Sequence, residues 1–245
     1  MSSFLAEIRG TLVPGRDSRH GPLPPLLLAM TLVTGLVDAF SYLLLGHVFV
    51  ANMTGNVVLL GFALVGAPGF SIAASVVAGA SFALGALVGG RVGSRLAQHR
   101  GRLLSVAATV QAALFAAAVV LAVLSGPAIS ASSRYALIVI LGLAMGIQNA
   151  AARTLAVPDL TTTVLTMTIT GIAADSTIAG GKGSRAGRRL TALVAMLAGA
   201  VIGAALVLYV HIVYPLAIAL GVTVVVAATS GVVGRSNSRW THADG

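Results

Sequence analysis

Long apolar runs separated by short polar or Gly-Pro breaks divide the chain into eight segments. Most have about 20 residues, enough for a helix to cross ~30 Å of hydrocarbon. Two segments differ: one opens with the polar run Asn52–Asn56, and the other is rich in threonine. The pattern predicts an all-α polytopic membrane protein. The segments lie near residues 22–46, 49–66, 70–90, 103–124, 135–152, 161–179, 190–210 and 212–230.

The composition supports a membrane protein and argues against several other classes. The 245 residues are 57% hydrophobic and only 9% charged, too few polar side chains to cover a soluble core. The chain has no cysteine, and its five histidines do not show a metal-ligand spacing. Paired carboxylates and a nucleophile–base pair are also missing from the pattern. We therefore expect a protein that is not an enzyme and uses neither a metal nor another cofactor.

The net charge of +9 comes from basic residues gathered in the short connections between apolar segments. Such residues are retained on the cytoplasmic side of a membrane, which explains the charge without nucleic acid. We expect the lipid bilayer to be a partner and expect no nucleic acid.

The basic residues distinguish between eight and six membrane crossings. If all eight segments cross, ten of the 15 Lys and Arg residues face the cytoplasm. If segments 49–66 and 161–179 enter and leave on the same face, only Arg134 of the 15 lies outside. The second arrangement fits the rule better and predicts six transmembrane helices plus two re-entrant or broken segments.

This arrangement predicts the organisation of the whole chain. Residues 1–21 form a cytoplasmic N-terminal segment with a short interfacial helix over Met1–Val13. Residues 22–230 form one membrane domain, and 231–245 form a cytoplasmic C-terminal tail. Three crossings per half make the second half, 135–230, an inverted-topology repeat of the first, 22–124.

A weak internal repeat supports two related halves, because Gly35–Ala39 of the first half aligns with Gly146–Ala150 of the second. The third segment of each half also carries small residues at every fourth position, a spacing that permits close approach of membrane helices. These residues are Ser81, Gly85 and Gly89 in the first half and Ala195, Gly199 and Gly203 in the second.

Asp38 is the strongest candidate for a functional residue. It lies well inside the first apolar segment, where an ionised carboxylate costs several kcal/mol. One interpretation is a proton acceptor or a ligand for a cation or polar solute. The other is a structural, protonated carboxyl that bonds to a neighbouring helix, with Asn149 of the second half as its partner. Gln148 and Asn149 themselves could bind a polar solute or join two helices.

The two polar segments supply the other candidates, because a re-entrant segment survives in a bilayer only where it is buried or lines a cavity. Alternatively, the threonines simply bond back to their own helix. Gln111 has no repeat partner and is predicted to be structural. The predicted solute or ion pathway comprises Asp38, Asn52, Thr54, Gly55, Asn56, Gln148, Asn149, Thr166 and Thr170.

Four stretches of the chain together resemble the YoaK-type family of bacterial multi-pass membrane proteins, a domain-of-unknown-function family. They are Gly35–Ala39, Gly46–Asn56, Gly142–Ala150 and Thr161–Thr166. The resemblance extends over roughly residues 22–230. It implies several spans and a location in the bacterial plasma membrane, and it implies no established substrate.

We therefore expect a transporter or channel-like permease for a small solute or ion, with a polar site near the bilayer midplane. The alternative is a membrane scaffold or regulator that transports nothing and acts by packing against a partner. A homo-oligomer remains open in either case.

Overall fold

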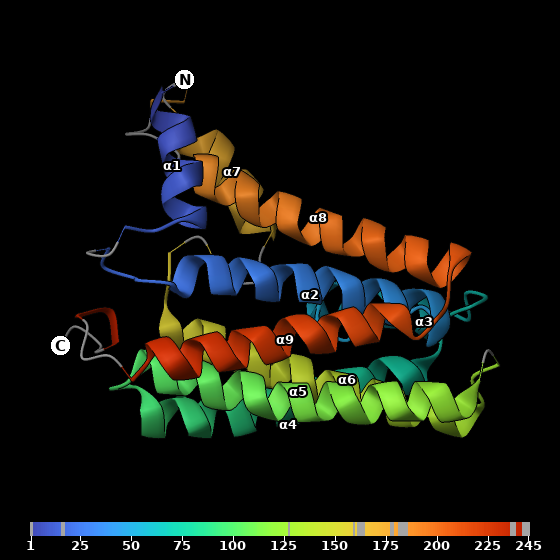
Figure 1. Cartoon of the computed structure of the whole chain (residues 1–245). Coiled ribbons are helices and arrows are strands. Elements are labelled where there is room, and N and C mark those ends of the chain that lie inside the picture. The colour runs from blue at the N-terminus through green and yellow to red at the C-terminus, as the bar shows by residue number, and fades with distance from the viewer. Residues whose placement is uncertain are drawn as a thin grey trace.

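The computed structural model is all-helical over the residues it describes, which are 2–15, 18–126, 128–158, 160, 165–176, 179–180, 186–235 and 239–241. Its six long helices lie roughly along one common axis, in alternating directions, and form a bundle (Figure 1). They have 20 to 26 residues each: α2 (Leu23–Leu44), α4 (Ile72–Leu96), α5 (Arg100–Ser125), α6 (Ala131–Leu155), α8 (Ala186–Tyr209) and α9 (Tyr214–Val233). Shorter helices in the described part of the chain are α1 (Ser2–Leu12), α3 (Met53–Leu64), α7 (Leu165–Ala174) and the 3-10 turn η2 (Arg239–Thr241).

Each of the six long helices is long and apolar enough to cross a membrane. By contrast, α3 has 12 residues and α7 has 10. At a rise of 1.5 Å per residue they extend only about 18 and 15 Å, well short of the hydrocarbon thickness. The predicted all-α polytopic membrane protein with six transmembrane helices and two shorter segments is confirmed.

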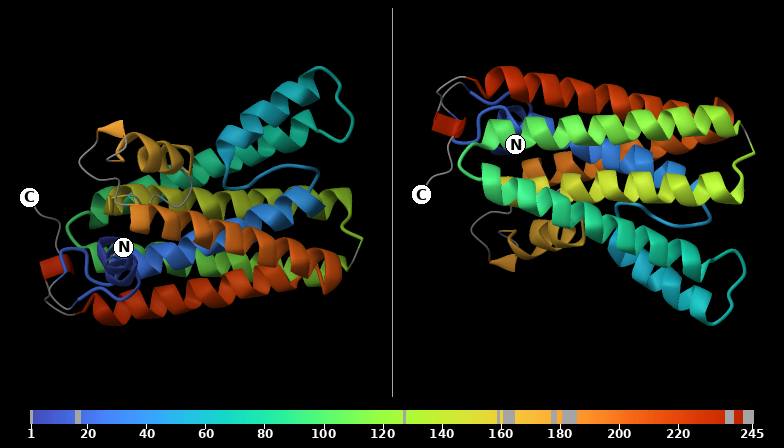
Figure 2. Two further views of the ribbon diagram at one scale, coloured as in Figure 1. Left: turned by 90° about the horizontal axis from the view of Figure 1, so that it is seen from above. Right: turned by 90° about the horizontal axis from the view of Figure 1, so that it is seen from below.

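The bundle has two ends, which we call the terminal end and the far end. The terminal end carries α1, the start of α2 and η2; the far end carries the turns after α2 and α5 (Figure 1). Because α2 ends and α4 begins at the far end, the stretch that contains α3 starts and finishes at that end of the bundle. The stretch containing α7 does the same at the terminal end. As a result α3 and α7 lie at opposite ends of the bundle, and α6 runs opposite to α2 (Figure 2).

Small residues let the most extensive helix pairs pack backbone against backbone. In the α4–α6 pair, a Cβ added to Gly85 would collide with the backbone of Leu143. In the α2–α8 pair, a Cβ at Gly199 would collide with the backbone of Leu32. Such close approach gives membrane helices extensive van der Waals contact. The spacing of small residues therefore has the structural role that the pattern indicates.

The contacts of the two pairs correspond to one another. Leu143 is the residue that aligns with Leu32 when Gly146 is aligned with Gly35 in the sequence repeat. One turn further on, Gly89 meets Ile147 and Ala150 of α6. Its counterpart Gly203 meets Leu36 and Ala39 of α2, the two residues that align with Ile147 and Ala150. Helix α5 packs against α9, the corresponding helix of the other half.

Two segments differ from the sequence prediction. The basic stretch 91–102 is mostly helix, not loop, because α4 continues to Leu96 and α5 begins at Arg100. Arginine tolerates this position because its long side chain carries the charge beyond the apolar part of the helix. The second segment is the predicted C-terminal tail, in which Trp240 is 5% exposed and packs against Gly21. The tail thus contributes to the packing of the membrane domain.

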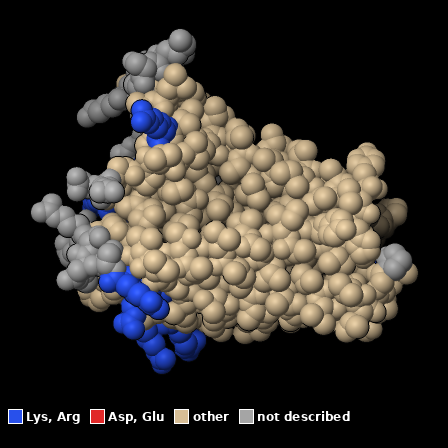
Figure 3. Space-filling model, in the orientation of Figure 1, with Lys and Arg blue, Asp and Glu red and all other residues tan. Residues whose placement is uncertain are grey.

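Basic side chains gather at the terminal end. On the face in Figure 3, the blue Lys and Arg atoms all lie at that end. Arg91 and Arg95 end α4, Arg100 begins α5 and Arg153 lies in the last turn of α6. Arg134, near the start of α6, lies at the far end.

Two neighbouring glycines of α4 test the close helix packing. Gly89 is buried against α6, whereas Gly90 is exposed and has open space around its Cβ position. We expect Gly89→Leu to destabilise the protein by about 1–3 kcal/mol through overpacking. This would lower its thermal unfolding midpoint in detergent, with Gly90→Leu close to the wild type. Equal effects of the two substitutions would contradict the α4–α6 contact described above.

Candidate functional site

Asp38 is buried in α2 and is held by the loop that follows this helix. Gly46 and His47 both adopt positive φ angles, which end α2 and turn the chain back toward the bundle. The returning loop is buried, with Val50 at 0% and Ala51 at 2% exposure. The backbone N–H groups of these two residues donate to Oδ1 of Asp38, over 3.1 and 2.9 Å. One carboxylate oxygen therefore satisfies two backbone groups that hydrocarbon could not.

The polar run Asn52–Asn56 completes this loop. Asn56 is 4% exposed; its Oδ1 accepts the Phe49 N–H over 2.8 Å, and its Nδ2 donates to the Phe49 carbonyl. Asn52 caps α3 by accepting the Gly55 N–H over 3.4 Å. A Cβ at Gly55 would collide with the Phe49 ring. Of this run, Thr54 is exposed and lies outside the polar cluster.

The second carboxylate oxygen of Asp38 is different. Oδ2 is fully buried and accepts no hydrogen bond from any described residue. Asp38 as a whole is only 5% exposed. A buried carboxylate oxygen without a partner is costly unless a proton or a cation joins it. Among the candidates, Oδ2 is therefore the buried carboxylate oxygen that has room in its hydrogen bonding for a proton or a cation.

A second polar cluster joins three long helices one turn away. Gln111 of α5 donates through Nε2 to Oε1 of Gln148 in α6 over 2.7 Å. Gln148 in turn donates to the Thr34 hydroxyl over 2.9 Å and to the Met30 carbonyl over 3.2 Å. Residues i and i+4 share one helix face, so Thr34 places this cluster directly next to Asp38 along α2. Both clusters together form the candidate site.

Gln111, which the sequence analysis predicted to be structural, joins α5 to α6 through its hydrogen bond to Gln148. It is 0% exposed, and its Oε1 accepts no hydrogen bond from a described residue. The available signal was its amide side chain deep inside an apolar segment. Lacking a counterpart in the internal repeat, it gave no indication of its partner, because that partner is 37 residues away on another helix.

The hydrogen bonds of Asp38 and Gln148 do not include the remaining candidates. Asn149 is half-buried and donates to the Met145 carbonyl of its own helix over 2.9 Å. Thr166 and Thr170 are exposed on α7, which packs against α8 at the terminal end. Thr161, Thr162 and Thr163 lie outside the described residues. The hydrogen bonds of Asp38 go to the loop before α3, not to Asn149, which was the structural partner considered from the sequence.

Comparisons with known proteins agree with this architecture. A family model described as "Protein of unknown function (DUF1275)" matches residues 26–229. The UPF0700 transmembrane protein YoaK of Bacillus subtilis (strain 168) is 35% identical over 152 residues, covering 61% of this chain. The alignment spans 65% of that relative, just under two thirds of its length. No solved structure matches the chain.

The glutamine pair gives a test of the second polar cluster. Gln148→Leu removes an acceptor and two donor contacts and leaves the buried Gln111 amide with only the weak acceptor Sδ of Met145, at a cost of about 1–3 kcal/mol. Adding Gln111→Leu removes the orphaned amide, so we expect the double variant to be more stable than the two single losses predict. Thermal unfolding of all four proteins in detergent measures this coupling. Strictly additive losses would contradict a hydrogen bond between the two amides.

Proposed function

Because the chain belongs to the DUF1275 family, whose description assigns no function, we propose its function from its own residues: ion-coupled transport of a small polar solute. Asp38 binds the coupling proton or cation. The amides of Gln111 and Gln148, together with Thr34, form the adjacent polar surface that the solute contacts. No covalent chemistry is proposed at this site.

The observation that carries this proposal is the unpartnered Oδ2 of Asp38. The Val50 and Ala51 N–H groups need only one acceptor atom, which a neutral asparagine would also supply. A carboxylate at this depth is costly, and the loop alone does not require one. The second oxygen is accounted for when the residue exchanges a proton or a cation during transport.

The arrangement of the halves supports the same class of function. We propose that the two halves are inverted-topology repeats. Support comes from the opposite directions of α2 and α6, and from the matched contacts of Gly85 with Leu143 and of Gly199 with Leu32. Many secondary transporters place their site between such repeats, near the middle of the bilayer.

The orientation and location are part of the proposal. Basic residues at the terminal end favour a cytoplasmic position for that end, by the positive-inside rule. Both α1 and η2 lie there, so the N- and C-terminal segments face the cytoplasm of a bacterial cell. The membrane is then the plasma membrane.

A scaffold or regulatory function remains the competing proposal, since one observation favours it. Oδ1 of Asp38, Asn56 and Gln148 all take part in hydrogen bonds that hold the fold together. If these groups serve packing alone, the protein has no solute pathway. The alternatives differ in whether the protein supports any flux.

Asp38→Asn in proteoliposomes tests the transport proposal. Pools of labelled amino acids, sugars, nucleosides and organic acids are offered with and without an imposed proton or sodium gradient. We expect wild-type uptake from at least one pool to be accelerated by a gradient. Asp38→Asn keeps an oxygen for the loop but cannot bind the ion as a carboxylate does, so this acceleration should disappear.

Asp175→Asn is the matched control. Asp175 is half-exposed and pairs with Arg189 at the surface over 2.7 Å, a type of pair that contributes little to stability. We expect it to transport like the wild type. Undiminished gradient acceleration in Asp38→Asn would refute the role of Asp38. Absence of uptake from every pool by inserted wild-type protein would favour the scaffold.

A further inference from the structure

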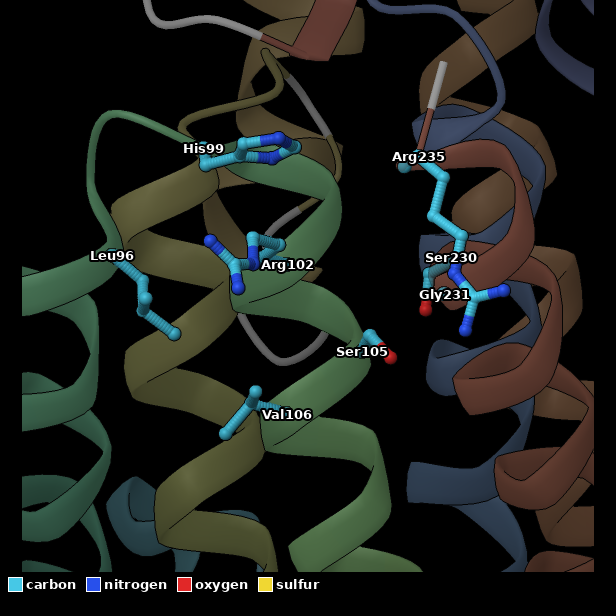
Figure 4. Close-up of a pocket in the computed structure, with 9 residues that line it drawn as sticks. Leu96, His99, Arg102, Ser105, Val106, Ser230, Gly231 and Arg235 are labelled. Carbon is cyan, nitrogen blue, oxygen red and sulfur yellow. The ribbon is translucent and has the colours of Figure 1, made fainter.

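A pocket of about 640 Å³ opens at the terminal end of the bundle and shares no lining residue with the candidate site. It lies where α4 ends, α5 begins and α9 ends (Figure 4). Its wall carries two arginines, one on α5 and one just after α9. The lining residues are Leu96, His99, Arg102, Ser105, Val106, Ser230, Gly231, Gly234 and Arg235.

The side chains of the two arginines of this pocket make no hydrogen bond or ion pair with any described residue. Figure 4 shows Arg102 extending from α5 and Arg235 from the end of α9, on two sides of the pocket, with Ser105 and Ser230 between the helices. Both arginines are exposed. A guanidinium group is a planar fork that matches the oxygens of a phosphate group, so a pocket with one arginine on each of two walls favours an anion.

The acidic residues that the structure describes do not neutralise this pocket. Glu7 accepts the Gly187 N–H at the start of α8 over 3.0 Å. Asp175 pairs with Arg189, and Asp38 is inside the bundle. None of these three carboxylates lines the pocket, so no described acidic side chain neutralises its positive charge.

The apolar part of the wall indicates where such an anion comes from. Val106 lines the pocket and is 39% exposed. One turn toward the middle of α5, Val110 is 41% exposed. Ala113 and Ala117 continue the same exposed face. An apolar track that runs from a basic pocket into the hydrocarbon region fits a molecule with a charged head and an acyl chain.

We propose that this pocket binds a phosphate-bearing anion, and that this anion is the headgroup of an anionic phospholipid. Arg102 and Arg235 supply the positive charge that attracts the phosphate, and the Val106–Val110 face of α5 contacts the first part of an acyl chain. The site lies at the end where basic residues gather, the level at which phospholipid headgroups meet a membrane protein.

Lipid titration of the full chain in neutral detergent tests this proposal. The thermal unfolding midpoint is measured with dihexanoyl phosphatidylglycerol, dihexanoyl phosphatidylcholine and sodium phosphate, because a ligand that binds the folded state raises the midpoint. We expect phosphatidylglycerol to raise it well above the phosphatidylcholine background. Arg102→Gln combined with Arg235→Gln should weaken the apparent affinity for phosphatidylglycerol roughly tenfold or more.

Arg91→Gln combined with Arg95→Gln is the charge-matched control. These arginines are exposed at the same end of α4 but do not line the pocket. The control should respond to phosphatidylglycerol like the wild type. An equal loss in both double variants, or no response of the wild type above the phosphatidylcholine background, would overturn the proposal.

The sodium phosphate series identifies the source of the anion. A midpoint unchanged by phosphate, beside a clear response to phosphatidylglycerol, supports the lipid headgroup. An equal response to phosphate at the same concentrations would overturn the lipid assignment and leave a site for soluble phosphate. The two double variants replace only exposed arginines, at positions 91, 95, 102 and 235, and leave the apolar spans unchanged. An unfolding midpoint equal to that of the wild type without lipid verifies that each variant is folded.

Discussion

A bilayer offers no water to backbone groups, so every N–H and C=O that leaves a helix inside the hydrocarbon must find a partner in the protein. The loop between α2 and α3 meets this requirement with two side chains. Asp38 accepts two N–H groups, and Asn56 satisfies both backbone groups of Phe49. The short helix α3, its return to the far end and the position of the candidate site all depend on these bonds.

The same bonds give Asp38 two distinct oxygens. Oδ1 holds the loop, whereas Oδ2 is buried without a partner. Asparagine in place of Asp38 keeps an oxygen for the loop but removes the carboxylate, whereas an apolar residue removes both. Comparison of the two substitutions therefore separates the effect on the fold from the effect on any ion binding. The equivalent position of the second half is Asn149, a neutral amide. The matched glycine contacts of the two halves are therefore not accompanied by a matched carboxylate.

The glutamine cluster is a second polar feature that the two halves do not share. Gln148 aligns with Val37 of the first half in the sequence repeat, so only one half carries an amide there. Matched glycine contacts build the frame of α2, α4, α6 and α8, and unmatched polar residues lie inside it. These unmatched polar residues, with the unpartnered Oδ2 of Asp38 foremost, are the groups on which our transport proposal rests.

Much of this architecture could be predicted from the sequence, because a membrane limits the choices. Apolar length predicted eight segments, and the distribution of Lys and Arg reduced the expected crossings to six. The small residues at every fourth position predicted close packing. The partners of polar side chains could not be predicted in the same way. Gln111 contacts Gln148 across two helices, and Asn56 pairs with a loop backbone, so both contacts depend on tertiary structure. The buried position of Trp240 likewise depends on Gly21, which lies near the opposite end of the sequence.

The most direct test of the account asks whether α3 crosses the membrane. The chain lacks cysteine, so single cysteines can be placed at Ala67, just after α3, and at exposed Gly15 in the N-terminal segment. Labelling by an impermeant maleimide is compared in intact and permeabilised cells. The account predicts that Ala67→Cys reacts in intact cells and Gly15→Cys only after permeabilisation. Reaction of both positions from the same side would mean that α3 crosses, and would contradict the six-span fold.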